Sequence, residues 1–98
     1  MQLRIHHGLV AIDQDSKRLI ERGTRLAIGR HSFAVSVVRI HLACGSPVDG
    51  RETISCVVRA QLQDGESIEL DEQAHDPYEA AMLAVRRLER ILRRRGQI

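Results

Sequence analysis

The stretch that most constrains the fold of this chain runs from Asp76 to Arg95 and has the pattern of one long amphipathic helix. Asp76 can accept hydrogen bonds from the first free backbone N–H groups, Pro77 suits the first helical position, and Glu79 completes a capping box. At about 100° per residue, the apolar side chains share one stripe, formed by Tyr78, Ala81, Val85, Leu88 and Leu92. This stripe predicts a helix that packs against a second layer of the protein.

The opposite face of this helix is strongly basic. Its arginines lie on an arc centred almost opposite the apolar stripe and are Arg86, Arg87, Arg90, Arg93 and Arg94. A solvated helix face usually mixes Glu with Lys, whereas the one nearby acid here is Glu89. Because so many like charges repel one another unless an anion meets them, we interpret the face as an anion-binding surface. An ordinary solvated face is the alternative.

A second basic helix is predicted from about Asp13 to Ile28, with Asp13 or Asp15 as its cap and Gly29 at its end. Its predicted apolar stripe comprises Leu19, Ile20, Gly23, Leu26 and Ala27. Its basic residues are predicted on the far side and comprise Lys17, Arg18, Arg22 and Arg25. We expect Gly23 to let this helix approach the sheet closely, at a cost of about 1 kcal/mol in helix propensity.

Four further segments predict strands, because they alternate between apolar and polar side chains or are rich in β-branched residues. They are residues 2–7, 33–42, 53–63 and 66–72. Asp64-Gly65, between the last two segments, is a strong β-hairpin signal, and residues 43–51 are predicted to form a loop. The side chains predicted to face the core are Leu3, Ile5, Val38, Ile40, Leu42, Ile54, Cys56, Val58, Ala60, Leu62, Ile68 and Leu70.

The predicted order is β-α-β-β-β-α in a single domain of residues 1–98, which is an α+β fold. A strand, a crossover helix and a second strand should place the first two strands parallel, and the hairpins add two antiparallel strands. Each helix has one apolar stripe, so both should cover the same face of a four-stranded mixed sheet. The other face is then left in water, and two arginine-rich stripes share one outer surface. Such an arrangement is double-stranded-RNA-binding-domain-like.

The net charge of +2 is unevenly distributed along the chain. Residues 1–42 carry +4, residues 43–79 carry −7 and residues 80–98 carry +5. This asymmetry predicts a basic side that could bind a polyanion and an acidic side that keeps the protein soluble and oriented. No stretch approaches the roughly 18 apolar residues of a membrane span, the N-terminus lacks a signal-peptide pattern, and the two cysteines have no paired spacing. We therefore expect a cytoplasmic protein with no membrane partner.

The sequence offers no catalytic constellation, so we expect neither an enzyme nor a cofactor. His41 and Cys44 have a ligand-like spacing, but a zinc site needs four ligands, and no metal site is expected. Cys56 lies on the inward face of a predicted strand, where a buried thiol is common. With one Phe, one Tyr and no Trp, base stacking on aromatic platforms is not expected. Any RNA binding should therefore depend on the RNA backbone and its shape.

Three features of the chain point together to a known family. They are the six-element order, the segment DGESIELDEQAHDPYEAA and the basic terminal helix AVRRLERILRRR, with weaker support from the opening MQLRIHHGLVAID. Through them nearly the whole chain resembles the short ribosome hibernation promoting factors and ribosome-associated inhibitor A, the ribosomal subunit interface proteins. The resemblance implies a translation inhibitor of the stress response. It would bind ribosomal RNA of the small subunit through both helices, in the decoding region where messenger and transfer RNA sit.

Carried over to this chain, the resemblance assigns RNA binding to Lys17, Arg18, Arg22, Arg25, Arg86, Arg87, Arg90, Arg93 and Arg94. Lys17 is the only lysine among fifteen basic residues, whereas helices of the family mix in many lysines. Arginine adds bidentate contacts to phosphate. The loop of residues 44–51, CGSPVDGR, matches no motif of the family. The chain also lacks the second domain through which long members dimerise, so we expect a monomer that does not pair ribosomes unaided.

Two other functions are alternatives. The arginine face could dock on an acidic protein partner, or on the acidic strand of a second copy in a homodimer. A nuclease or hydrolase is a more distant alternative, because it would need a catalytic group that the sequence does not supply, and no small-molecule substrate is expected. Sensitivity of ribosome co-sedimentation to ribonuclease distinguishes RNA binding from docking on a protein.

Overall fold

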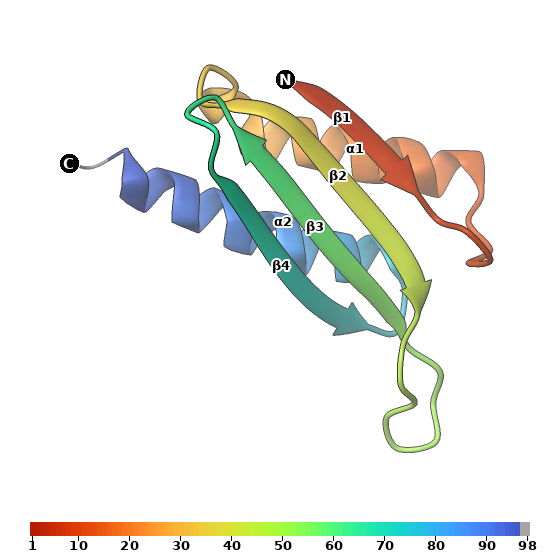
Figure 1. The fold of residues 1–98 in the computed structure, drawn as a ribbon. Helices are drawn as coiled ribbons and strands as arrows, with labels where there is room; N and C mark the ends of the chain where they lie inside the picture. The colour runs from red at the N-terminus through yellow and green to blue at the C-terminus, as the bar shows by residue number, and fades with distance from the viewer. Residues whose placement is uncertain (97–98) are drawn as a thin grey trace.

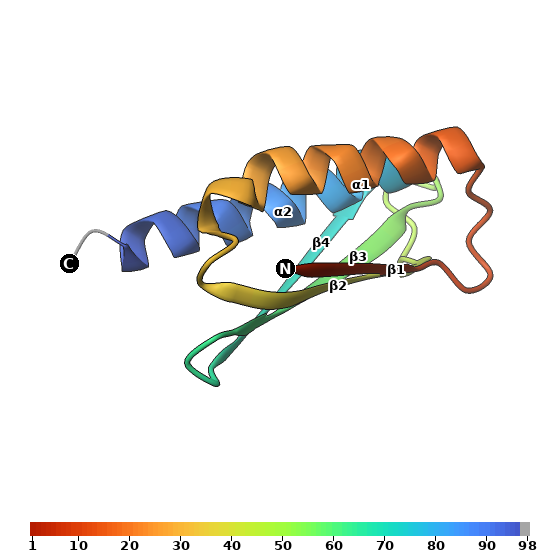
Figure 2. The same cartoon turned by 90° about the horizontal axis from the view of Figure 1, so that it is seen from above.

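The computed structural model describes residues 1–96 and contains the predicted elements in the predicted order. They are β1 (Gln2–His6), α1 (Gln14–Ile28), the short 3-10 helix η1 (Gly29–His31), β2 (Val35–Cys44), β3 (Ile54–Leu62), β4 (Ser67–Ala74) and α2 (Pro77–Arg95). The strands form one sheet with both helices behind it in the view of Figure 1. Figure 2 separates the two layers, with the helices on one side and the sheet on the other. The predicted α+β architecture is confirmed.

The strands lie in the order β1-β2-β3-β4. β1 and β2 pair in parallel, as predicted from the crossover helix between them, and the two remaining pairs are antiparallel. The predicted hairpin turn joins β3 to β4. Gly65 has a φ of 93°, a backbone conformation that residues with a side chain rarely adopt. The Asp64 carboxylate accepts a hydrogen bond from the backbone N–H of Glu66 at 2.9 Å.

Side-chain caps begin both long helices. The Asp13 carboxylate accepts the backbone N–H of Ser16 at 2.7 Å, which lowers the pKa of Asp13, so Asp13 rather than Asp15 is the cap of α1. In α2, Asp76 accepts the N–H of Glu79 at 3.0 Å. The side chain of Glu79 makes no reciprocal bond within residues 1–96, so the predicted capping box is only half formed.

The core lies between the sheet and the helices. Val38, Ile40 and Val58 of the central strands are fully buried in one cluster with Val85 and Leu88 of α2. The predicted stripe of α2 is correct except at its start, where Tyr78 is exposed and its hydroxyl lies near Gly23 of α1. No helix within residues 1–96 is long and apolar enough to cross a membrane.

The buried face of α1 differs from the predicted one. Leu19 and Leu26 are 53% and 76% exposed, and the fully buried positions are Ile20, Thr24 and Ile28. Thr24 can be buried because its hydroxyl donates to the carbonyl oxygen of Ile20 at 2.7 Å. The helix is therefore rotated about its axis relative to the prediction.

Gly23 faces α2 and not the sheet, so the prediction that it lets α1 approach the sheet is wrong. A Cβ atom at position 23 would lie 2.7 Å from the sulfur of Met82, which is closer than real Cβ contacts. The absence of a side chain therefore lets the two helices lie side by side.

The strand boundaries differ slightly from the predicted ones. β2 begins at Val35 rather than Phe33, because η1 continues the chain through a turn in which Ala34 donates its N–H to the carbonyl of His31 at 2.9 Å. Phe33 is consequently 80% exposed. The inward-facing residues on the edge strand or near strand ends are only half-buried: Leu3, Ile5, Ile54 and Ile68.

Candidate nucleic-acid interface

The basic residues of the two helices share one outer side of the molecule, since α1 and α2 lie next to each other over the same face of the sheet (Figure 2). The exposed members of the predicted set are Arg18, Arg22, Arg25, Arg86, Arg87, Arg90, Arg93 and Arg94. Lys17 is half-buried, because it lies one helical turn before Ile20 and two before Thr24, on the side that faces the core. The predicted place of Lys17 on the far side of α1 is therefore wrong.

A groove of about 440 Å³ lies between the two helices. It is lined by Leu26, Ala27, Arg30, Arg86, Glu89, Arg90 and Arg93. The groove gathers arginines from segments that lie far apart in the sequence, so the cationic side chains converge on one concave strip. Such a strip concentrates positive potential more than a convex helix face does.

Arg30 belongs to this groove, although the sequence did not assign it a role. α1 ends at Gly29 as predicted, and the separate 3-10 helix η1 carries the chain on for one more turn. Arg30 therefore follows Leu26 and Ala27 by four and three residues and lines the groove with them. A 3.6-residue period followed past Gly29 would have identified it.

Arg90 also borders a second hollow, of about 340 Å³, on the other side of α2. This hollow is lined by Arg87, Arg90, Ile91 and Arg94. Arg90 thus stands between two concave surfaces and is the central cation of the α2 face. Neither hollow is lined by Arg18, Arg22 or Arg25, which lie on the exposed face of α1.

Some of the arginines are engaged in ion pairs. Arg87 donates to the Glu72 carboxylate at 2.8 Å and to the Asp71 carbonyl at 3.2 Å. Arg93 lies 3.7 Å from Glu89, and Arg18 lies 4.0 Å from Asp15. The predicted arginines with no ion-pair partner among residues 1–96 are Arg22, Arg25, Arg86, Arg90 and Arg94. These five cations are the ones most available to an external anion.

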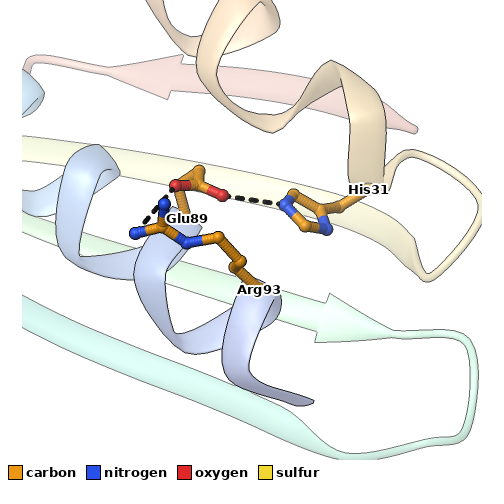
Figure 3. A network of polar contacts seen from close by, with 3 residues as sticks. All are labelled: His31, Glu89 and Arg93. Carbon is orange, nitrogen blue, oxygen red and sulfur yellow. Dashed lines mark hydrogen bonds and ion pairs between the residues drawn. The ribbon is translucent and has the colours of Figure 1, made fainter. Parts of the chain in front are cut away.

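Figure 3 shows the contact that joins the end of η1 to α2. Nε2 of His31 lies 2.9 Å from one carboxylate oxygen of Glu89, and Arg93 approaches the other oxygen. An ionised carboxylate only accepts hydrogen bonds, so Nε2 is the donor. The hydrogen bond with His31 is the main reason that the pKa of Glu89 is lowered, and the charges of Arg93, His31 and Arg30 act in the same direction. Glu89 therefore remains ionised and neutralises part of the groove.

Of the two free cysteines, Cys44 is exposed and Cys56 belongs to the core. Cys56 is fully buried, and burial, followed by the nearby charges of Asp71 and Glu72, raises the pKa of its thiol to about 12. A thiol of this kind stays protonated and is a poor nucleophile. Within residues 1–96, no three His, Cys, Asp or Glu side chains gather as metal ligands would.

The comparisons with known proteins identify the fold. No protein-family model and no curated protein sequence matches the chain. The N-terminal domain of Protein Y from Thermus thermophilus matches it with a TM-score of 0.71 at 18% identity, over 96% of this chain and 98% of that one. A ribosomal subunit interface protein from Coxiella burnetii matches with a TM-score of 0.79 at 16% identity, over 100% of both chains. The resemblance indicated by the sequence is thus confirmed, and at these identities it shows the fold.

Proposed function

We propose that this protein binds the small ribosomal subunit through its ribosomal RNA and inhibits translation without catalysing a reaction. The observation that supports this function best is the outer surface of the two helices, where Arg22, Arg25, Arg86, Arg90 and Arg94 have no ion-pair partner among residues 1–96. This surface lies on a fold shared with a ribosomal subunit interface protein.

Arginine is suited to such a target. Its planar guanidinium group forms paired hydrogen bonds with phosphate oxygens, and it is always charged. Folded ribosomal RNA presents closely spaced phosphates on a curved surface, and the groove between α1 and α2 offers cations on both of its walls. Binding of this kind depends on shape and charge rather than on reading base edges.

Occupation of the decoding region is the inhibitory mechanism that we propose. A bound protein with helices of 15 and 19 residues would exclude messenger and transfer RNA from the same place by its volume alone. Inhibition would then require affinity and position but no chemical step, in keeping with a buried, protonated Cys56.

Docking on an acidic protein is the rival function. The acidic strand β4 and the turn before it are a poor partner for a second copy, because several of their carboxylates already bind arginines of their own chain. Glu66 pairs with Arg95 at 2.6 Å and Glu72 pairs with Arg87 at 2.8 Å. A homodimer through this strand would have to break these pairs, so the rival function requires a different acidic protein.

Sedimentation and translation together test the proposed function. The wild-type protein should co-sediment with small subunits in a sucrose gradient, should lose this association after ribonuclease treatment, and should stop translation of a reporter messenger. Arg86→Glu with Arg90→Glu should abolish both effects, because the change removes two attractions and adds two repulsions without touching the core. Arg51→Glu, an exposed change in the loop between β2 and β3, is the control and should retain both. Association that survives ribonuclease would favour the rival function.

A further inference from the structure

The face of the sheet that the helices leave open carries a row of arginines. This face points toward the viewer in Figure 1. The strand register places Arg4 opposite Arg39 and Arg39 opposite Arg59, so one arginine from each of β1, β2 and β3 lies in a straight line across the sheet. Glu69 of β4 ends the line opposite Arg59.

Such a row is unfavourable without an anionic partner. Like charges directly opposite each other destabilise a sheet. Glu69 compensates Arg59, whose Nε donates to it at 3.0 Å. Within residues 1–96, the one hydrogen-bond partner of the Arg4 guanidinium is the neutral amide of Gln2, whose oxygen accepts at 3.3 Å. Arg39 is half-buried between the two and has no ion-pair partner within residues 1–96. Two neighbouring cations on β1 and β2 are therefore left uncompensated.

A pair of stacked histidines lies next to these cations. His6 and His41 are opposite each other in the register, two residues further along β1 and β2 than Arg4 and Arg39. Their rings stack with centroids 4.9 Å apart and planes inclined by 18°. Both side chains are exposed, and a separation of two residues along a strand is about 7 Å. Imidazole rings and guanidinium planes are groups on which unpaired RNA bases stack.

We propose that this open sheet face is a second RNA-binding surface, specific for single-stranded RNA. Arg4 and Arg39 would bind backbone phosphates, and the pair of His6 and His41 would stack against a base. The surface is separate from the helices of the proposed function and lies on the opposite side of the sheet (Figure 1). Its ligand must be unpaired, because bases within a duplex are stacked on each other and do not expose their faces.

The charges of the sheet also fix where such a strand can lie. Glu69 and Asp71 of β4 are exposed on this face and would repel a phosphate backbone. The RNA is therefore restricted to β1 and β2. An acidic protein would also be attracted by Arg4 and Arg39, but it would have no use for the stacked histidines, so the observations favour RNA.

Binding of a labelled twelve-nucleotide uridine RNA, measured by fluorescence anisotropy at low salt, tests this surface. The measurement is made in the Arg86→Glu, Arg90→Glu background, in which the α2 surface is disabled. This variant should still bind the RNA. Adding Arg4→Glu and Arg39→Glu should weaken binding at least about tenfold, whereas adding Arg51→Glu should change it less than about twofold. Arg39→Gln, which removes the charge but keeps a polar side chain, should weaken binding in the same direction if Arg39→Glu does not fold.

The histidines give the test that separates RNA from other anions. His6→Ala with His41→Ala should weaken binding of the uridine RNA by about tenfold, as loss of one stacked base does, and should leave binding of inorganic polyphosphate unchanged. The proposal is overturned if the background variant binds no RNA, if the histidine changes leave RNA binding intact, or if polyglutamate competes as well as RNA does. None of these outcomes bears on small-subunit binding by the helices, which the background variant already lacks.

Discussion

Leu88 and Leu26 show that burial decides how much a leucine contributes to the stability of the fold. Leu88 of α2 is fully buried between helix and sheet, whereas Leu26 of α1 is largely exposed beside the groove. Leu88→Ala should lower the free energy of unfolding by about 2–4 kcal/mol, because it leaves a cavity. Leu26→Ala should lower it by less than about 0.5 kcal/mol. Urea melts of the two variants check this pair, and equal losses would show that α1 buries its leucines after all.

Glu89 should affect stability and anion binding in opposite directions. Its carboxylate holds His31 and lies beside Arg93, so Glu89→Gln should destabilise the fold. The same change removes a negative charge from the groove, so it should strengthen binding to small subunits. A thermal melt and a binding titration on one preparation measure the change in stability and the change in affinity. Weaker binding together with lower stability would mean that Glu89 mainly positions Arg93.

The stability that Glu89 contributes should depend on pH. Its pKa is lowered in the folded state, so the contribution is complete above the ordinary carboxylate value and is lost as the pH falls through the lowered one. Glu89→Gln should therefore flatten the acidic limb of the stability curve relative to the wild type. Parallel curves for the two proteins would contradict the role of His31 as the partner of Glu89.

At the scale of secondary-structure elements, the face of α1 is the decisive feature. Arg22 lies on its exposed side, in line with Leu26 and Arg30 of the groove, whereas Lys17 lies half-buried on the side of the core. Arg22→Glu should weaken binding to purified small subunits by about tenfold, and Lys17→Glu should weaken it much less. The two changes alter the charge equally, which makes Lys17→Glu the matched control in a filter-binding assay. A larger loss of affinity from Lys17→Glu than from Arg22→Glu would contradict RNA binding by the exposed side of α1.

The elements were predictable from the sequence where polar and apolar residues segregate strictly. The arginines of α2 lie opposite its leucines, and the strands alternate, so the core faces of α2, β3 and β4 could be assigned. In α1 the segregation of polar and apolar residues did not predict the buried face. The Thr24 hydroxyl donates a hydrogen bond to the carbonyl oxygen of Ile20, so Thr24 can be buried while Leu26 is exposed. Helix periodicity alone does not register such a local bond.

The arrangement of residues from distant segments could not be predicted. The groove joins Arg30 to Arg86, and the sheet register brings His6 next to His41. Both juxtapositions depend on how the elements pack, which a single sequence does not state. The shortage of Phe, Tyr and Trp argued against base stacking, but it did not take account of two histidines placed side by side.

At the scale of the whole molecule, the charge asymmetry along the chain separates paired charges from unpaired ones. Glu72 of β4 and Glu66 of the preceding turn pair with Arg87 and Arg95 of α2, whereas the outer faces of the helices keep cations without ion-pair partners among residues 1–96. A net charge of +2 thus coexists with a strongly cationic surface. Attraction to a polyanion, such as the RNA of the proposed function, would therefore be directed to particular faces of the molecule.

Affinity for purified small ribosomal subunits, measured against salt concentration, tests RNA binding by the helix surface most directly. With about five phosphate contacts, the logarithm of the binding constant should fall linearly with the logarithm of salt, at a slope of about −4. Between about 50 and 200 mM salt the affinity should then drop by some two to three orders of magnitude. Arg90→Glu should make the slope shallower by about one contact, and Arg51→Glu should leave it unchanged. A slope near zero, or equal effects of the two variants, would contradict RNA binding by the helix surface.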